Sequence, residues 1–311
     1  MNCLKCKKNI KKASFYGLHA NCFMDWFNLS QFLEFSDLDP KNNYTSNHSI
    51  TKMKSFYHGQ YRKYSARLNS IQYILKVQEP QYPDLPSVEY LCNKIADLLN
   101  LQVPKYYLIR YSEEDEVGSN KQELLTFVTR NFTQDYVGAL HHIYKFLPKG
   151  KKHYNCENII GVIKEQTKSL NDVERFVKIG LFDAFTGNND RHGRNLGIID
   201  TGRSKKLAPM YDNPSYFGVE DERLLMADFN ISCAIRTSTV KGPKLLDYVQ
   251  EFKSLELGKV CLSFIKKIIN KYPLILTEVE NSEISQNRKK AFINFLSARL
   301  KDCKQSIEEG I

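Results

Sequence analysis

The chain has 311 residues, of which 42% are hydrophobic and 26% charged, a composition typical of a globular protein large enough for two domains. Its formal net charge of +10 is compatible with an acidic protein surface, a nucleic acid or a nucleotide as partner. No apolar run reaches the roughly 18 residues of a membrane-spanning helix, and the basic N-terminus lacks the apolar segment of a secretory signal. We therefore expect a cytoplasmic protein, although the sequence leaves open whether it is exported to another cell. The lysine clusters are not interleaved with aromatic residues, so we predict no direct nucleic-acid binding.

Four soft metal ligands stand close together in the first 22 residues. Cys3 and Cys6 are separated by two residues, and so are His19 and Cys22. Two pairs at this spacing can bind zinc tetrahedrally, and an empty knuckle is the alternative that the sequence leaves open. A polar, Asn-rich stretch follows, so we interpret residues 1–50 as a Cys-rich N-terminal module and loop.

The next region has the pattern of a small sheet with one helix. Short runs of Tyr, Ile, Leu and Val predict four strands, at residues 61–68, 71–77, 106–110 and 123–129. Between the two pairs of strands, apolar residues at helical spacing predict a helix that begins at Ser87 and is closed by Val103-Pro104. This β–β–α–β–β order is typical of the N-terminal lobe of a kinase.

Beyond residue 131 the pattern becomes mostly helical. One apolar stripe at helical spacing runs from Leu170 to Phe185. Further helices are expected near residues 244–255, 259–271 and 288–304, with a loop-and-strand insertion at residues 187–217. We therefore predict an α+β protein, with a β-rich N-lobe in residues 51–131 and an α-helical C-lobe in residues 132–311.

The segment that follows the apolar stripe carries the strongest sign of chemistry. Asp190 and Asn195 are separated by four residues and lead into an apolar run, which is the spacing of the catalytic loop of protein kinases. An aspartate can orient an attacking hydroxyl and accept its proton, and an amide oxygen five residues later is a hard ligand for Mg²⁺. A second carboxylate, Asp212, follows a predicted turn and can hold the metal ion over phosphates.

The spacing from Asp190 to Asn195 also arises by chance, and as a structural alternative the first residue caps a turn and the second starts a strand. The order of the other parts favours a kinase site. Lys76 ends a predicted strand, so its ammonium can reach nucleotide phosphates, and Glu89 lies in the first turn of the next helix. Glu89 either pairs with Lys76 or only interacts favourably with the helix dipole, and the sequence leaves both open.

Several segments resemble one known family. Residues 176–182 lead into residues 189–195 (Asn-Asp-Arg-His-Gly-Arg-Asn), which are similar to the catalytic loop of the HipA-type serine/threonine kinases of bacterial toxin–antitoxin systems. Residues 207–212 are similar to the Leu-x-Pro-x-Tyr-Asp metal motif of that family, and the helix at residues 89–104 resembles its helix. The resemblance covers roughly residues 53–300 and implies a two-lobed protein-kinase-like fold.

The resemblance implies ATP and Mg²⁺ as cofactors. It makes Asp190 the catalytic base, and Asn195 and Asp212 the Mg²⁺ ligands. The residues that would bind the nucleotide are Gly59, Gln60, Lys76, Thr129, His192, Asn195, Tyr211 and Asp212. Gly59 and Gln60 belong to the expected phosphate loop, and Ser55 takes the position of an autophosphorylation site that ejects this loop and switches the kinase off. Where the family has Glu-Arg-Phe at the hinge, this chain has Thr129-Arg130-Asn131.

The resemblance also implies a substrate and partners. The substrate would be an aminoacyl-tRNA synthetase, glutamyl or tryptophanyl, whose phosphorylation blocks translation. The chain resembles shortened members that lack most of the N-terminal subdomain, which a small companion protein supplies, and a DNA-binding antitoxin would neutralise it. Two other functions stay open: phosphorylation of a small molecule or lipid, and a pseudokinase that only binds partners.

Overall fold

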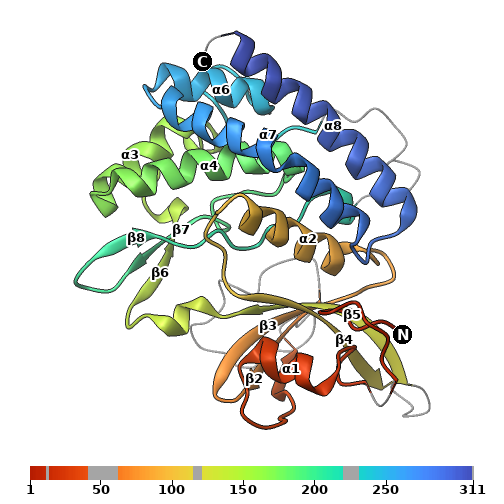
Figure 1. Cartoon of the computed structure of the whole chain (residues 1–311). Coiled ribbons are helices and arrows are strands. Elements are labelled where there is room, and N and C mark those ends of the chain that lie inside the picture. Colours follow the sequence, from red (N-terminus) through yellow and green to blue (C-terminus); the bar gives the residue numbers. More distant parts are fainter. Residues whose placement is uncertain (12–13, 41–61, 115–120, 220–230, 310–311) are drawn as a thin grey trace. The chain divides into compact units, whose positions relative to one another are not determined.

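The computed structural model describes residues 1–11, 14–40, 62–114, 121–219 and 231–309. The chain divides into two compact units (Figure 1). Unit 1 comprises Met1–Tyr90 and Pro104–Gln134, and unit 2 comprises Leu91–Val103 and Asp135–Ile311. Three residues of the expected phosphate loop lie outside the described residues: Ser55, Gly59 and Gln60.

Unit 1 is built on a five-stranded antiparallel sheet with the order β1-β2-β3-β5-β4. Its strands are β1 (Ser36–Pro40), β2 (Lys63–Leu68), β3 (Ile71–Val77), β4 (Tyr106–Glu114) and β5 (Lys121–Arg130). A two-residue turn joins β2 to β3, and both of its residues, Asn69 and Ser70, have positive φ, 50° and 64°. Such a turn matches the right-handed twist of the strands and fixes their register.

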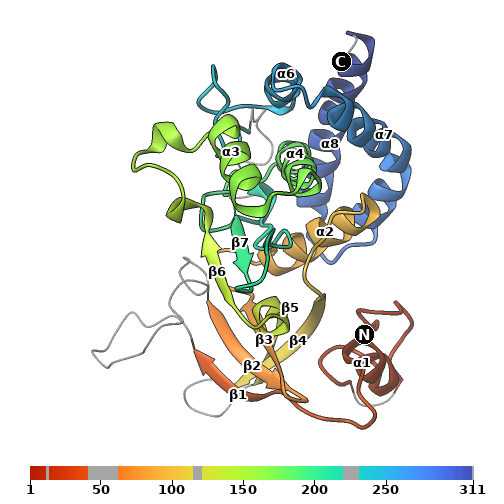
Figure 2. The ribbon, with the colours of Figure 1, turned by 90° about the vertical axis from the view of Figure 1, so that its left-hand side faces the viewer.

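The N-terminal residues of unit 1 pack against this sheet. The helix α1 (Ala20–Phe27) places Phe23 and Phe27 in a core that also includes Tyr73 and Tyr107 from the strands. The rings of Phe27 and Tyr107 lie 4.2 Å apart, centroid to centroid. Figure 2 shows α1 on one face of the sheet. The Cys-rich module is therefore part of the core of unit 1.

The helix α2 (Leu85–Leu98) follows the sheet's first three strands in the chain. Its Pro86 stands in the first turn, where a missing backbone N–H costs nothing. Val88, Leu91 and Ile95 are buried and share one helical face. This apolar spacing explains why the segment folds as a helix. The residues of α2 up to Tyr90 are counted in unit 1 and the later ones in unit 2.

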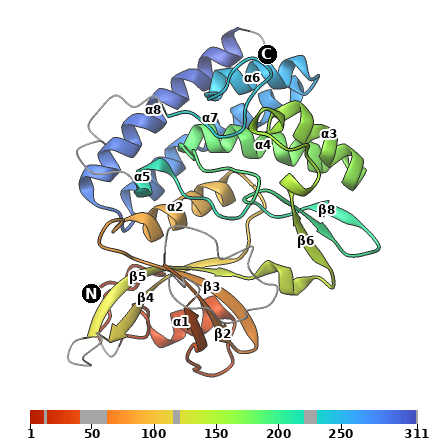
Figure 3. The same ribbon diagram turned by 180° about the vertical axis from the view of Figure 1, so that it is seen from behind.

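Unit 2 is mostly helical (Figure 3). Its further helices are α3 (Cys156–Thr167), α4 (Leu170–Thr186), α5 (Tyr216–Val219), α6 (Leu245–Ser254), α7 (Gly258–Glu280) and α8 (Gln286–Glu308). A three-stranded sheet joins β6 (Ala139–His142), β7 (Gly197–Asp200) and β8 (Lys205–Leu207). Its short 3₁₀ turns are Ile143–Lys145 and Lys151–His153, and a third, Phe132–Asp135, begins in unit 1. The predicted α+β class, with a β-rich and a helical part, is confirmed.

The central helix of unit 2 is α4, with both ends defined by their capping residues. The Ser169 hydroxyl accepts a hydrogen bond from the N–H of Asp172 at its start, and Gly187 ends it with a left-handed φ of 73°. Its residues Phe176, Leu181 and Phe185 are fully buried. No helix in the described part of the chain is both long enough and apolar enough to cross a membrane.

Candidate active site

The loop that follows α4 is anchored on the last turn of the helix. Asn188 donates from its backbone to the Asp183 carbonyl and from Nδ2 to the Asp183 carboxylate, both at 2.9 Å. The Oδ1 of Asn188 then accepts from the N–H of Asp190 at 3.0 Å. These bonds fix the backbone of Asp190, while its side chain is 53% exposed and can meet a substrate.

Asp190 and Asn195 belong to one hydrogen-bonded turn. The carbonyl of Asp190 accepts from the N–H of His192 at 2.7 Å and from Nδ2 of Asn195 at 2.9 Å. Asn195 is buried, and its N–H bonds the carbonyl of His192 at 2.8 Å. Because Nδ2 is engaged by Asp190, the Oδ1 of Asn195 is the atom that remains to face a cation. This is the oxygen that the predicted magnesium role requires.

Arg191 is the buried centre of this loop. Only 1% of the residue is exposed, and its guanidinium forms a two-bonded pair with the carboxylate of Asp183, at 2.8 and 3.0 Å. Burial alone would lower the pKa of Arg191, but the charge and hydrogen bonds of Asp183 raise it above its ordinary value. The guanidinium is therefore a permanent positive charge inside unit 2. Its Nη1 also donates to the carbonyl of Asn195 at 3.0 Å.

The same guanidinium holds the segment that carries the second metal-binding candidate. Nη1 of Arg191 donates to the carbonyls of Tyr211 at 2.7 Å and of Asp212 at 3.3 Å, and Nη2 donates to Oδ1 of Asn213 at 2.6 Å. Asp212 has a φ of 53°, a left-handed conformation that aspartate tolerates better than most residues. Arg191 thus brings the loop of Asp190 and the loop of Asp212 to one point.

Two aromatic residues complete the site in unit 2. The hydroxyl of Tyr211 donates to the carbonyl of Arg194 at 2.7 Å, and burial raises the pKa of Tyr211 well above its usual range. Nδ1 of His192 accepts from the N–H of Arg194 at 3.2 Å. Nε2 of His192 lies 3.8 Å from Oδ1 of Asp190, so the imidazole stands beside the carboxylate of the proposed base.

The two candidates in unit 1 are on neighbouring strands. Lys76 on β3 forms a buried ion pair with Glu89 of α2, with Nζ 2.6 and 2.7 Å from the two carboxylate oxygens. This contact decides between the two interpretations of Glu89, because its carboxylate partners the lysine. Thr129 on β5 donates from its hydroxyl to the carbonyl of Lys105 at 3.4 Å.

In unit 2, the structure brings together the residues that the sequence singled out in that unit. Asp190, His192 and Asn195 share one loop of unit 2, which Arg191 ties to the segment of Tyr211 and Asp212. The donor set of unit 2 consists of carboxylate and amide oxygens, which suit Mg²⁺ rather than a softer metal ion. Such a set can bind a divalent cation and position a hydroxyl for proton removal.

Sequence reasoning missed the residues that hold these loops. Arg191, Asp183 and Asn213 make most of the buried hydrogen bonds of the site, yet none was singled out. The sequence does place the two opposite charges close together, because Asp183 stands just before the end of the apolar stripe and Arg191 just after it. A lone arginine is normally exposed, so its burial could not be inferred without the fold.

The sequence of this chain is similar to a known family and to one curated protein. Residues 39–273 match the family model described as the HipA-like C-terminal domain. Y4dM of Sinorhizobium fredii is 25% identical over 148 residues, which cover 45% of this chain. That match spans 36% of the length of Y4dM, about a third of the relative.

Two solved structures are similar in fold. The kinase CtkA of Helicobacter pylori, described as proinflammatory, matches with a TM-score of 0.59 and 20% identity, over 80% of this chain and 95% of CtkA. HipA of Shewanella oneidensis MR-1, solved with HipB and operator DNA, matches with a TM-score of 0.56 and 13% identity, over 89% of this chain and 73% of HipA. At these identities the likeness establishes the kinase-like fold.

Proposed function

Because this chain belongs to the family of HipA-like C-terminal domains, we propose that it is an ATP- and Mg²⁺-dependent serine/threonine protein kinase. The observation that carries the proposal is the set of hydrogen bonds from Arg191 to the carbonyls of Asn195 and Asp212. These bonds keep the segment of Asp212 beside the loop that carries both Asp190 and Asn195. Phosphoryl transfer depends mainly on positioning and on charge stabilisation, and this geometry supplies both.

In this proposal each residue has one task. Asp190 orients the attacking hydroxyl and takes its proton as the γ-phosphoryl group leaves ATP. Oδ1 of Asn195 and the carboxylate of Asp212 bind Mg²⁺, which neutralises charge on the phosphates when it is bound. Lys76, oriented by Glu89, contacts the phosphates.

The remaining nucleotide contacts are assigned by family resemblance. His192 and Tyr211 line the nucleotide site, and Thr129 meets the adenine. Gly59 and Gln60 form the phosphate loop, and Ser55 is the autophosphorylation site. The last three lie outside the described residues, so their roles rest on the sequence alone.

We extend the proposal to the biological setting. The protein acts in the cytoplasm as the toxin of a toxin–antitoxin system, with an aminoacyl-tRNA synthetase, glutamyl or tryptophanyl, as substrate. Its partners are a DNA-binding antitoxin and a small companion protein. In support, a structure of similar fold is that of a toxin–antitoxin HipA with HipB and operator DNA.

Label transfer from γ-³²P-ATP tests the reaction class directly. The full chain is incubated with Mg²⁺ alone, with glutamyl- or tryptophanyl-tRNA synthetase, and with lipid vesicles or small hydroxyl compounds. The proposal predicts label on protein serine or threonine that disappears when EDTA is added. Label only on a lipid or small molecule would replace it with the alternative kinase, and bound ATP without any transfer would replace it with a binding module.

A further inference from the structure

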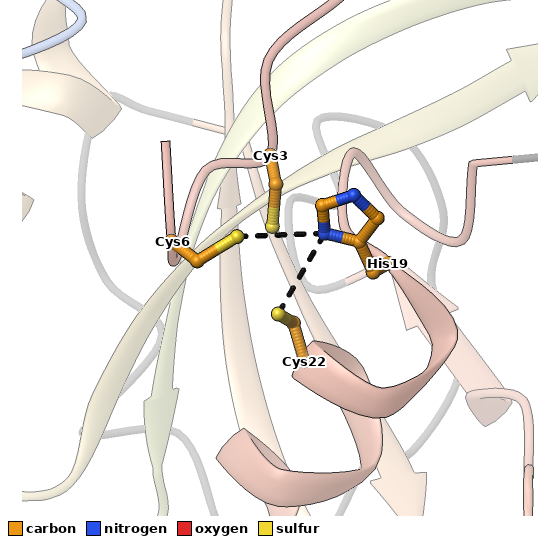
Figure 4. Close-up of side chains that lie close together, drawn as sticks. All are labelled: Cys3, Cys6, His19 and Cys22. Atoms are coloured by element: carbon orange, nitrogen blue, oxygen red, sulfur yellow. Dashed lines mark hydrogen bonds between the residues drawn. The ribbon is translucent and has the colours of Figure 1, made fainter. Parts of the chain in front are cut away.

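The N-terminal module gathers four potential metal ligands at one point. Cys3, Cys6, His19 and Cys22 each offer one ligand atom, and these atoms all lie within 4.8 Å of one another (Figure 4). Nδ1 of His19 is 3.4 Å from the sulfur of Cys6 and 3.8 Å from the sulfur of Cys22. With Zn–N and Zn–S bonds of about 2.0 and 2.3 Å, the edges of a tetrahedral site measure about 3.5–3.8 Å. The two observed distances are close to such edges.

The backbone turns Cys3 and Cys6 toward this point. The N–H of Lys7 bonds the carbonyl of Cys3 at 2.9 Å, and the N–H of Cys3 bonds the carbonyl of Lys8 at 2.9 Å. Lys7 has a φ of 60°, a left-handed conformation that costs energy for a lysine. The turn brings both cysteine sulfurs into the cluster with His19 and Cys22.

A second turn delivers the other two ligands. Phe15 and Leu18 exchange backbone hydrogen bonds at 2.9 and 3.0 Å, around two residues with positive φ, Tyr16 at 53° and Gly17 at 76°. The chain then enters α1, with His19 as its N-cap. The pair His19 and Cys22 has i,i+3 spacing, so both face the same side of the first helical turn.

The hydrogen bonds around the cluster suit metal binding. Nε2 of His19 lies 3.2 Å from the carbonyl of Asn9, which orients the ring so that Nδ1 faces the sulfurs. A second-nitrogen bond of this type fixes the tautomer of metal-bound histidines. Three sulfurs so close repel one another once charged, and a divalent cation removes that repulsion.

We propose that Cys3, Cys6, His19 and Cys22 bind one zinc ion, and that this ion has a structural role. Three sulfurs and one imidazole nitrogen form a closed tetrahedral set without an open position, which is typical of structural rather than catalytic zinc. The site belongs to unit 1 and is independent of the proposed kinase reaction.

The zinc ion stabilises the packing of the module on the sheet. Cys3 and Leu4 are in the same buried cluster as Leu75 of β3 and Ile109 of β4. The carbonyl of Tyr16 accepts from the N–H of Arg110 on β4 at 2.9 Å. Because the described residues before α1 (1–11 and 14–19) contain no regular helix or strand, the metal ion supplies what fixes their fold.

Metal analysis of the full chain tests the site. The protein is expressed with zinc, purified and dialysed, and its zinc is measured by inductively coupled plasma mass spectrometry. We expect about one zinc ion per chain in wild type, and a loss of most of it in Cys6→Ser and His19→Ala. The matched controls Cys261→Ala and His153→Gln lie outside the cluster and keep the ion. Cys6 is exposed, so its replacement leaves no cavity.

A second measurement keeps the proposal falsifiable if the ligand variants do not fold. Wild type is stripped of metal under reducing conditions and titrated with Co²⁺, which shows thiolate-to-metal charge-transfer absorption in a tetrahedral sulfur site. That absorption, displaced by one equivalent of Zn²⁺, supports the proposal. A folded, reduced wild type that gives no such absorption and takes up no zinc overturns it, and so does iron found in place of zinc.

Discussion

Two segments, one in each unit, gather polar groups around a centre in different ways. In unit 2, residues 187–213 are organised around the guanidinium of Arg191, a positive charge that the chain itself contributes. In unit 1, the described residues up to Cys22 bring four electron-rich ligand atoms together. The first segment is organised by a cation of the chain itself, and the second, in our proposal, by a bound zinc ion.

The difference explains why one centre is visible in the sequence and the other is not. Structural zinc ligands typically come in pairs at short spacing, so the pairs Cys3-x2-Cys6 and His19-x2-Cys22 can be recognised in the sequence. A buried guanidinium is satisfied by backbone carbonyls and one carboxylate. Every chain contains many of these groups, so its partners form no recognisable sequence motif. Folded structure is therefore required to recognise Arg191 as the centre of the site.

The largest effect is expected from removing the internal cation. Arg191→Met leaves the buried carboxylate of Asp183 without its partner, and breaking a buried pair in this way costs about 3–5 kcal/mol. The free energy of unfolding, measured by denaturant titration, should fall by that amount. Arg194→Met removes an exposed arginine from the same loop and should change it little. Adding Asp183→Asn to Arg191→Met should restore part of the loss. Equal stability of Arg191→Met and wild type would contradict the role assigned to the guanidinium.

A smaller loss is expected from the buried ion pair of unit 1. Lys76→Met leaves the carboxylate of Glu89 buried without this partner, at a cost of about 3 kcal/mol. The lysine side chain is slightly more accessible than that of Arg191, which places the cost at the low end. Denaturant unfolding of Lys76→Met, compared with the exposed Lys105→Met, measures it. A loss no greater than that of the control would show that the pair adds nothing to the stability of unit 1.

The smallest effect concerns pH and unit 2. Burial lowers the pKa of His142 below 6.5, and the charges of Arg194, His192 and His141 lower it further, against a backbone hydrogen bond at Arg194 that raises it. Below pH 6.5, His142 therefore binds a proton more readily in the unfolded chain than in the folded one. The free energy of unfolding falls as the pH drops from 6.5 toward the pKa of His142 in the folded chain. His142→Gln should flatten this decline in unfolding free energy, and His153→Gln should leave it. An unchanged slope in His142→Gln would assign the decline to other groups.

The regular elements were predictable where one pattern dominated. The apolar stripe from Leu170 to Phe185 corresponds to α4, and the four strands expected between residues 61 and 129 were found to within a few residues. The prediction of a loop from residue 36 was wrong for Ser36–Pro40, which pairs with β2 as β1, and β6 was not predicted because neither short segment has an apolar alternation. Helix α3 was missed, although Asn155 caps it and buried isoleucines follow. Helix α7 is longer than expected because it continues past Pro273, where the buried Ile275 and Val279 favour further helix despite the missing N–H.

The residues proposed to face the ligand were singled out from the sequence, and those that support them were not. Asp190, Asn195 and Asp212 follow from the spacing that the chemistry demands. The left-handed φ of Asp212 and the buried bonds of Arg191 depend on segments far apart in the sequence meeting in the fold. Local sequence patterns do not predict such long-range contacts.

The most direct test of the account compares two aspartates of unit 2. Asp190→Asn removes the proposed base but keeps the side-chain size, and Asp200→Asn makes the same change ten residues later, at the end of β7. With γ-³²P-ATP and Mg²⁺, we predict that Asp190→Asn loses label transfer by about 10²-fold or more while it still binds ATP, and that Asp200→Asn transfers label like wild type. Label transfer by Asp190→Asn at the wild-type rate would contradict the central claim.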